Sequence, residues 1–200
     1  PWACNWYTDQ SLKCMYPELG RRAGYAVTVI YGPPSPGFDR LSLADVLRAI
    51  DMMPKPVIVC IKQEFPKGVK NKNGLCGGNM ATAFKALGAV GIITDGPSRD
   101  IDEVRPLGIQ YMVTGVSPGH GALSVKAVNV PVNICGMDVC PGDIIHMDEN
   151  GAVKFPADKL ENVYELACRL QKIEAKRMRM MSETHDVEKI IDILNGFEDD

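Results

Sequence analysis

Apolar residues along the chain form short runs, separated by breaks rich in glycine and proline. The run Tyr25–Tyr31 (YAVTVIY) is made of β-branched and aromatic residues almost throughout, which predicts a strand. The run Pro56–Lys62 (PVIVCIK) is nearly all apolar, as expected of a strand that is buried on both faces. Between them, Ser42 and Asp45 form a near capping box, which predicts the start of a helix. This order of strand, helix and strand indicates a parallel sheet.

The stretch Gly74–Glu103 is the part around which the rest of the chain is organised. A glycine turn at residues 77–79 opens onto the amphipathic run Met80–Leu87. Gly88 ends that run, and the apolar run Val90–Thr94 follows as a strand. Together with the strand before it, this stretch predicts a central βαβ unit.

Groups suited to binding charge gather at both ends of this unit. Backbone N–H groups at the start of a helix lack partners, and the helix dipole favours a negative charge there. After the strand come Arg99, whose guanidinium can bind a carboxylate through two parallel bonds, and Asp100, whose carboxylate suits a hard cation. We therefore expect a site for a small anionic substrate bridged to a divalent metal.

The second half of the chain reads as shorter strands followed by helices. The predicted strands are Leu107–Val113, Val125–Ile134, Val139–Met147 and Ala152–Phe155, of which the last three would form an antiparallel meander. A long helix is predicted over Pro156–Met181 and a short one over Val187–Leu194. Residues 1–20 read as a helical or irregular lead-in, and residues 182–200 as a tail. We expect one α/β domain over residues 1–200, with the βαβ unit, the meander and a C-terminal helix.

Composition and charge narrow the choice of partners. The chain has 200 residues and a net charge of −3, and its Lys and Arg are scattered, so we expect no nucleic-acid partner. No run of about 18 apolar residues occurs, so we expect no membrane span. Seven cysteines at irregular spacings do not suggest a disulfide framework. Because no secretory signal is visible either, we expect a reducing, cytoplasmic location.

The polar segment Glu64–Asn73 contains three lysines. It can be interpreted as a solvated connector between two elements. The alternative is a mobile flap close to the anion site.

Three blocks of sequence resemble one known family. The spacing G-x20-R-D-x2-E, from Gly78 to Glu103, resembles the signature of the RraA-like proteins, which include 4-hydroxy-4-methyl-2-oxoglutarate/4-carboxy-4-hydroxy-2-oxoadipate aldolases. Arg21–Val29 (RRAGYAVTV) is similar to the family's first core strand, and Val128–Pro156 is similar to its closing meander. The resemblance covers residues 20 to 180 approximately.

The resemblance implies a swivelling β/β/α fold, assembly into homotrimers or hexamers, and a divalent cation, Mg²⁺ or another such as Mn²⁺. It implies a lyase that cleaves 4-hydroxy-2-oxo dicarboxylic acids, and oxaloacetate, through a pyruvate enolate. By position, Asp100 would hold the metal and Glu103 would support the metal's water shell. Arg99 would bind the keto-acid end of a small 2-oxo acid, and the backbone amides of Asn79 and Met80 would receive its carboxylate.

One position departs from the aldolase pattern. Many aldolases of the family have Asp where this chain has Gly78, and that Asp helps to place the catalytic water. The proton carrier is therefore open between water held by Asn79, Glu64 and a neighbouring subunit. Gly78 also motivates a second hypothesis, a non-catalytic regulator of ribonuclease activity that binds a protein partner. The retained Asp100 favours an enzyme, for which a sugar acid is an alternative substrate.

Overall fold

The main sheet is built around its longest strand, β2, in a computed structural model that describes residues 4–196. Its strands follow the order β1-β5-β4-β3-β2-β9-β10, and β6 also pairs with β2. Their bounds are β1 Lys13–Cys14, β2 Arg22–Gly32, β3 Val57–Gln63, β4 Ala89–Thr94, β5 Gln110–Val113, β6 Ser124–Val128, β9 Ile144–Asp148 and β10 Gly151–Phe155. The predicted α/β fold class is confirmed.

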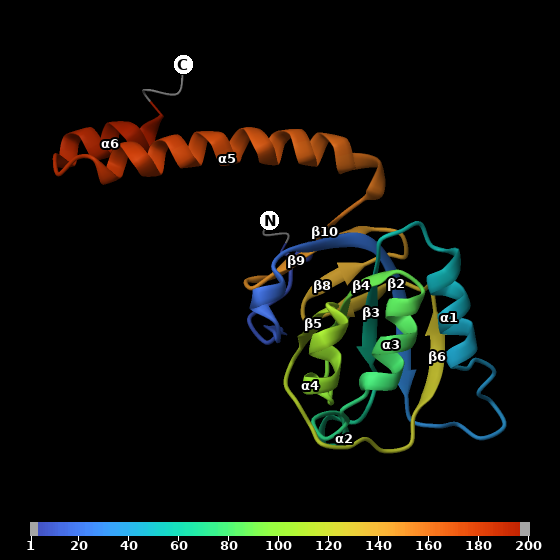
Figure 1. Cartoon of the computed structure of the whole chain (residues 1–200). Coiled ribbons are helices and arrows are strands. Elements are labelled where there is room, and N and C mark those ends of the chain that lie inside the picture. The colour runs from blue at the N-terminus through green and yellow to red at the C-terminus, as the bar shows by residue number, and fades with distance from the viewer. Residues whose placement is uncertain (1–3, 197–200) are drawn as a thin grey trace. The chain divides into compact units, whose positions relative to one another are not determined.

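Helices α1 (Leu43–Met52), α3 (Gly78–Ala86) and α4 (Ile101–Val104) lie over one face of the sheet (Figure 1). They connect β2 to β3, β3 to β4 and β4 to β5, and each of these strand pairs is parallel. The predicted βαβ unit is therefore confirmed. The carboxyl ends of these parallel strands lie at one edge of the sheet, where the loops of α/β proteins bind ligands.

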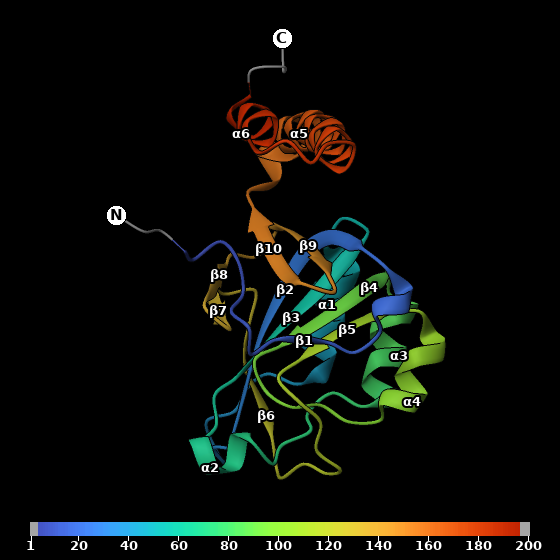
Figure 2. The same ribbon diagram turned by 90° about the vertical axis from the view of Figure 1, so that its left-hand side faces the viewer.

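The sheet is buried on both faces, as the apolar run in β3 predicts. Val57, Val59 and Ile61 belong to the core beneath the helices. Ile58 and Cys60 belong to a second core, which the strands β7 (Val132–Ile134) and β8 (Met137–Val139) cover. Figure 2 shows this hairpin and the helices α3 and α4 on opposite sides of the sheet. The layers are thus hairpin, sheet and helices.

The predicted continuous meander is wrong in its pairing. β6 pairs with β2, whereas β7 and β8 form a two-stranded sheet of their own, and β9 and β10 form a separate hairpin. The run predicted over 125–134 breaks because Asn129 has a positive φ of 53° and Pro131 has no N–H to donate. The strand predicted from Leu107 begins at Gln110, because a 3-10 turn, Arg105–Leu107, comes first.

The lead-in segment is irregular between Asn5 and Asp9, with a turn at residues 5–6 and an isolated bridge from Tyr7 to Val153. The Thr8 N–H donates to Ala152 O of β10 (2.9 Å), and the Asp138 N–H of β8 donates to Asn5 O (2.8 Å). The segment therefore joins the hairpin sheet to the main sheet. Further on, a 3-10 turn at Pro17–Leu19 leads into β2. The polar segment 64–73 contains a short helix, α2 (Lys67–Lys70).

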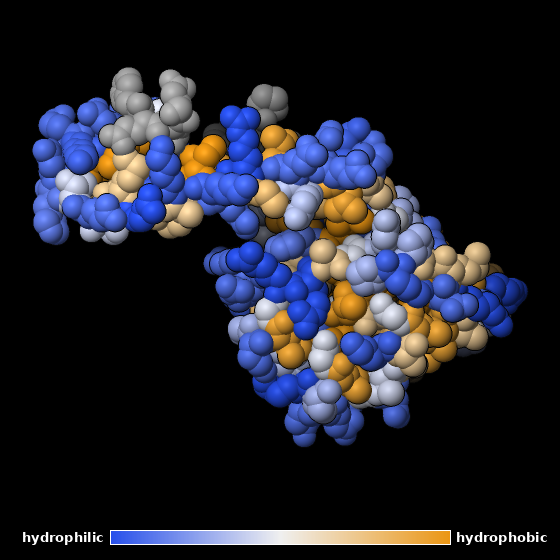
Figure 3. Space-filling view, turned by 45° about the horizontal axis from the view of Figure 1, so that its top comes forward, coloured by the Kyte–Doolittle hydropathy of each residue, from blue (hydrophilic) through white to orange (hydrophobic). Residues whose placement is uncertain are grey.

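By its contacts the chain divides into two compact units, the first ending at Ala157 and the second beginning at Asp158. The 3-10 turn Ala157–Lys159 leads into α5 (Leu160–Ser182) of the second unit, and α6 (Val187–Asn195) follows with Ile193 buried. The two predicted helices are confirmed; α5 starts later because of that turn. Figure 3 shows apolar patches within the polar surface of both units. That the two units make one domain stays a prediction. Among residues 4–196, no helix is long and apolar enough to cross a membrane.

Candidate functional site

Helix α3 begins two residues earlier than its apolar pattern predicts, at Gly78, with Gly77 as the N-cap. The Ala81 N–H donates to Gly77 O (3.0 Å) as the first bond of the helix. The N–H groups of Gly78, Asn79 and Met80 therefore have no acceptor within the helix. They form the positive end of its dipole.

The Asp100 carboxylate lies at this end of α3. Its Oδ2 accepts a hydrogen bond from the Gly78 N–H (3.0 Å). Asp100 is the N-cap of α4 and has left-handed backbone angles, φ 57° and ψ 41°. This unusual backbone directs the carboxylate to the tip of α3, where the helix dipole stabilises its negative charge.

The Arg99 side chain lies beside the same tip. Its Nη1 donates to Gly74 O (2.6 Å) and to Leu75 O (3.2 Å), in the segment that leads into α3. Its Nε is 3.3 Å from Asp100 Oδ2. The Arg99 side chain is 25% exposed and lines the cavity described below, and a guanidinium is suited to bind an anion.

The Glu103 carboxylate lies against Gly78. A Cβ on Gly78 would collide with Glu103 Oε2, and a Cβ on Gly77 would collide with Asp100 Oδ2. The two carboxylates therefore converge on two neighbouring glycines.

Two carboxylates can hold Mg²⁺, which binds through one or two carboxylates and keeps several waters. Within residues 4–196, no group of three or more His, Cys, Asp or Glu could hold a metal. The Asp100 and Glu103 carboxylates are ligands of the type that a hard cation with few protein ligands takes.

A cavity of about 270 Å³ opens beside Arg99 and Asp100, and the loop 116–118 forms its other wall. The Ser98 N–H donates to Gly115 O (3.0 Å), which holds this loop to the site. Of the predicted site residues, Gly78, Asn79, Met80 and Glu103 do not line the cavity; Asn79 and Glu103 are exposed and Met80 is half-buried. The structure thus brings Gly78, Arg99, Asp100 and Glu103 together, with the two remaining helix amides next to them.

Sequence reasoning missed a set of buried hydroxyl groups behind the site. Ser98 and Tyr111 both donate to Cys76 O, just before the glycine turn, and their hydroxyl groups also contact each other. The apolar run of β5 gives no sign that the Tyr111 hydroxyl has a specific partner. The sequence offered one signal for this set of hydroxyl groups: a polar residue, Ser98, directly precedes Arg99.

Asp95, directly after β4, is buried and carries a small hydrogen-bond and ion-pair network. It accepts from the Gln63 N–H (2.7 Å) and lies 2.7 Å from Lys62 Nζ and 2.8 Å from Lys70 Nζ. Lys70 belongs to α2, so this network anchors the polar segment to the end of β4.

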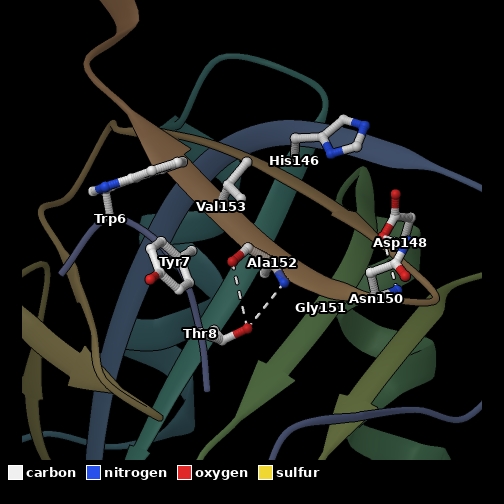
Figure 4. Close-up of a pocket in the computed structure, with 9 residues that line it drawn as sticks. All are labelled: Trp6, Tyr7, Thr8, His146, Asp148, Asn150, Gly151, Ala152 and Val153. Carbon is white, nitrogen blue, oxygen red and sulfur yellow. Dashed lines mark hydrogen bonds between the residues drawn. The ribbon is translucent and has the colours of Figure 1, made fainter. Parts of the chain in front are cut away.

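A second cavity, larger than the one beside Arg99, lies along β9 and β10 (Figure 4). It has a volume of about 520 Å³, with Trp6 and Tyr7 at one end and His146 and Asp148 toward the other. The two aromatic rings meet edge to face, with centroids 4.8 Å apart. No arginine and no helix start contribute to it, so the chemistry expected for a keto acid is absent from this hollow.

A family model described as RraA-like, Aldolase/RraA, matches residues 4–154. A 4-hydroxy-4-methyl-2-oxoglutarate aldolase from Thermus thermophilus is 31% identical over 86 residues, which are 42% of this chain and 52% of the relative. The chain spans about half the length of the curated relatives it matches.

Two solved structures are similar over most of the chain. An uncharacterized protein from Pseudomonas syringae has a TM-score of 0.74 and 24% identity, over 90% of this chain and 79% of that one. RraAS2 of Streptomyces coelicolor, described as an unusual member of the RNase ES inhibitor RraA protein family, has a TM-score of 0.70 and 26% identity, over 88% and 84%. These similarities match the hairpin, sheet and helix layers described above.

Proposed function

Because the chain belongs to the RraA-like family, which includes proteins named as aldolases and as RNase inhibitors, we propose that it is a divalent-metal-dependent lyase. Its substrates would be 4-hydroxy-2-oxo dicarboxylic acids and oxaloacetate. The observation that carries the proposal is the convergence of Asp100, Glu103 and Arg99 on the start of α3. A regulator that only binds a protein would not need this combination of carboxylates, guanidinium and open helix amides.

The binding step uses the positive groups at the tip of α3. The free N–H groups of Asn79 and Met80 would donate to the carboxylate of the 2-oxo acid, as helix starts do for anions. Arg99 is already fixed by two carbonyl groups, so its guanidinium would bind the substrate with little loss of conformational freedom. These contacts would orient the carbon–carbon bond that breaks.

Asp100 and Glu103 would hold Mg²⁺ or another divalent cation, such as Mn²⁺. When bound, this cation would act as a Lewis acid that stabilises the negative charge on the keto oxygen of the enolate. The Asp100 carboxylate is held in place by the Gly78 N–H, so its orientation is set before substrate arrives.

Cleavage by retro-aldol chemistry needs a proton to leave the 4-hydroxyl group, and the resulting pyruvate enolate needs a proton at carbon 3. Glu103 occupies the space of a side chain at position 78, so its carboxylate would take the role of the Asp that many aldolases have there. Decarboxylation of oxaloacetate gives the same enolate, so one site would serve both reactions. We further propose a homotrimer or hexamer in the cytoplasm as the working form.

Pyruvate release from oxaloacetate tests the proposal, measured with Mg²⁺ and with EDTA for the wild type and Arg99→Ala. We expect turnover that needs the metal and that Arg99→Ala abolishes. Equal background rates in all four reactions would refute a lyase.

The name of the Streptomyces relative motivates the second candidate, a regulator of ribonuclease activity. Inhibition of a ribonuclease by an Arg99→Ala variant that has lost turnover would favour this candidate. Turnover rates measured with a panel of 2-oxo acids and sugar acids would show which of these classes is the substrate.

A further inference from the structure

Asp100 is held in a conformation that it does not prefer. A non-glycine residue with φ near +57° is uncommon, and such backbones persist where the surrounding structure fixes them. Since this conformation aims the carboxylate at the tip of α3, whatever holds the backbone also holds the proposed site.

Buried hydroxyl groups bind the chain on both sides of the Arg99–Asp100 corner. On one side, Ser98 directly precedes Arg99, and it shares Cys76 O with the Tyr111 hydroxyl. On the other side, the Tyr16 hydroxyl donates to Ile101 O (2.5 Å), directly after Asp100.

The two tyrosine side chains pack against each other in the core. Their rings stack with centroids 6.2 Å apart and an interplanar angle of 19°, and both residues are fully buried. Tyr111 sits in β5, within the main sheet, and Arg105 lies 4.8 Å from the Tyr16 ring centroid. Burial raises the pKa of Tyr16 to about 12 and that of Tyr111 well above its usual range, so both hydroxyl groups stay protonated donors at neutral pH.

We propose that Tyr16, Tyr111 and Ser98 are positioning residues, which fix the Arg99–Asp100 corner relative to the start of α3. The stacked tyrosines connect the sheet to the segment before α3 through Cys76 and to α4 through Ile101. This inference rests on the proposed lyase function, because it assigns the pair a role at that site.

Tyr111→Phe and Tyr16→Phe test the inference, because phenylalanine keeps the ring and its stacking and removes only the hydroxyl group. Tyr31→Phe is the matched control, since Tyr31 is also buried in β2 but its hydroxyl has no hydrogen-bond partner. We would measure kcat and KM for oxaloacetate with Mg²⁺, the thermal midpoint, and amide hydrogen exchange over residues 98–104. This range includes the hydrogen bond that the Val104 N–H donates to Asp100 O (2.9 Å), so its exchange reports on the corner.

We expect kcat to fall about tenfold or more in Tyr111→Phe and Tyr16→Phe, because small misplacements of catalytic groups are costly. KM should change little, exchange over residues 98–104 should speed up, and Tyr31→Phe should match the wild type. If the wild type is active and kcat is unchanged in both test variants, the positioning role is refuted. The proposed lyase function is then unaffected. If the wild type has no turnover, the lyase is refuted, and unchanged exchange in the variants would then refute the positioning role as well.

Discussion

The Glu103 carboxylate fills the space that a side chain on Gly78 would need. Glu103 lies in α4, directly after the Arg99–Asp100 corner, and Gly78 opens α3. The two positions are therefore coupled: a glycine at 78 allows a carboxylate to enter from 103. In the proposed lyase, an acidic side chain at position 78 would have to displace the Glu103 carboxylate.

Substitution at position 78 tests this coupling. Gly78→Asp should crowd Glu103 and lower kcat/KM for oxaloacetate about tenfold or more, because two carboxylates repel at short range. Adding Glu103→Ala should raise the activity above that of either single variant, since one carboxylate then remains in uncrowded space. The double-mutant cycle measures this interaction. Strictly additive losses would show that the two positions are independent.

Arg99→Lys should lower kcat/KM by about 100-fold. A lysine ammonium cannot reproduce the flat guanidinium that contacts Gly74 O, Leu75 O and Asp100 at once. Arg48→Lys is the control, because the Arg48 side chain is 71% exposed and pairs with Asp45 in α1, away from the site. Steady-state kinetics of both variants measure this difference. If the two variants had equal kcat/KM, Arg99 would not belong to the substrate site.

Asp100→Asn should lose metal-dependent turnover by about 100-fold or more, since an amide binds a divalent cation more weakly than a carboxylate. Asparagine tolerates left-handed backbone angles, so the fold should survive. Asp102→Asn changes an exposed neighbour in α4 and should behave as the wild type. Calorimetric titration with Mn²⁺, together with rates, checks whether binding and activity fall together. Unaltered Mn²⁺ binding in Asp100→Asn would contradict the assignment.

Local patterns in the sequence predicted the first half of the fold well, because strands buried on both faces and helices with caps carry their own signals. The pairing in the second half depended on tertiary contacts. Thr8 bonds to Ala152 across 144 residues, which no local pattern encodes. The lead-in is irregular, which is one of the two alternatives expected, but the sequence did not show which strands it would contact.

The predicted site residues lie close together, but the sequence did not reveal their supports. Helix α3 begins before its first apolar position, so the Gly78 N–H serves as a partner for Asp100. The roles of Tyr16 and Tyr111 depend on carbonyl groups reached through the fold, and the hydrophobic pattern reads both residues as plain core.

Stability should fall as the pH rises above about 9. Burial raises the pKa of the Cys60 and Cys76 thiols from 9.0 to about 12. Below pH 9 both folded and unfolded chains keep these protons, so their contribution to stability is fully present. Between 9 and 12 the unfolded chain ionises first, and the contribution is lost. Urea unfolding at pH 8 and 10.5 measures this, and Cys76→Ala should depend less steeply on pH. A flat profile in the wild type would contradict the assigned shifts.

Asp95 should contribute to folding independently of catalysis. Its side chain is only 6% exposed and bonds to the Gln63 N–H and to two lysines. Asp95→Ala would leave a buried N–H without an acceptor and two ammonium groups without their counter-charge, so we expect a loss of about 2–4 kcal/mol in the free energy of unfolding. Asp95→Asn keeps an oxygen for the Gln63 N–H and should lose less.

Asp102→Ala, at an exposed position, should stay within about 0.5 kcal/mol of the wild type. Urea unfolding with an unchanged slope would assign the loss to the native state. If Asp95→Ala were as stable as Asp102→Ala, the network would hold α2 without stabilising the fold.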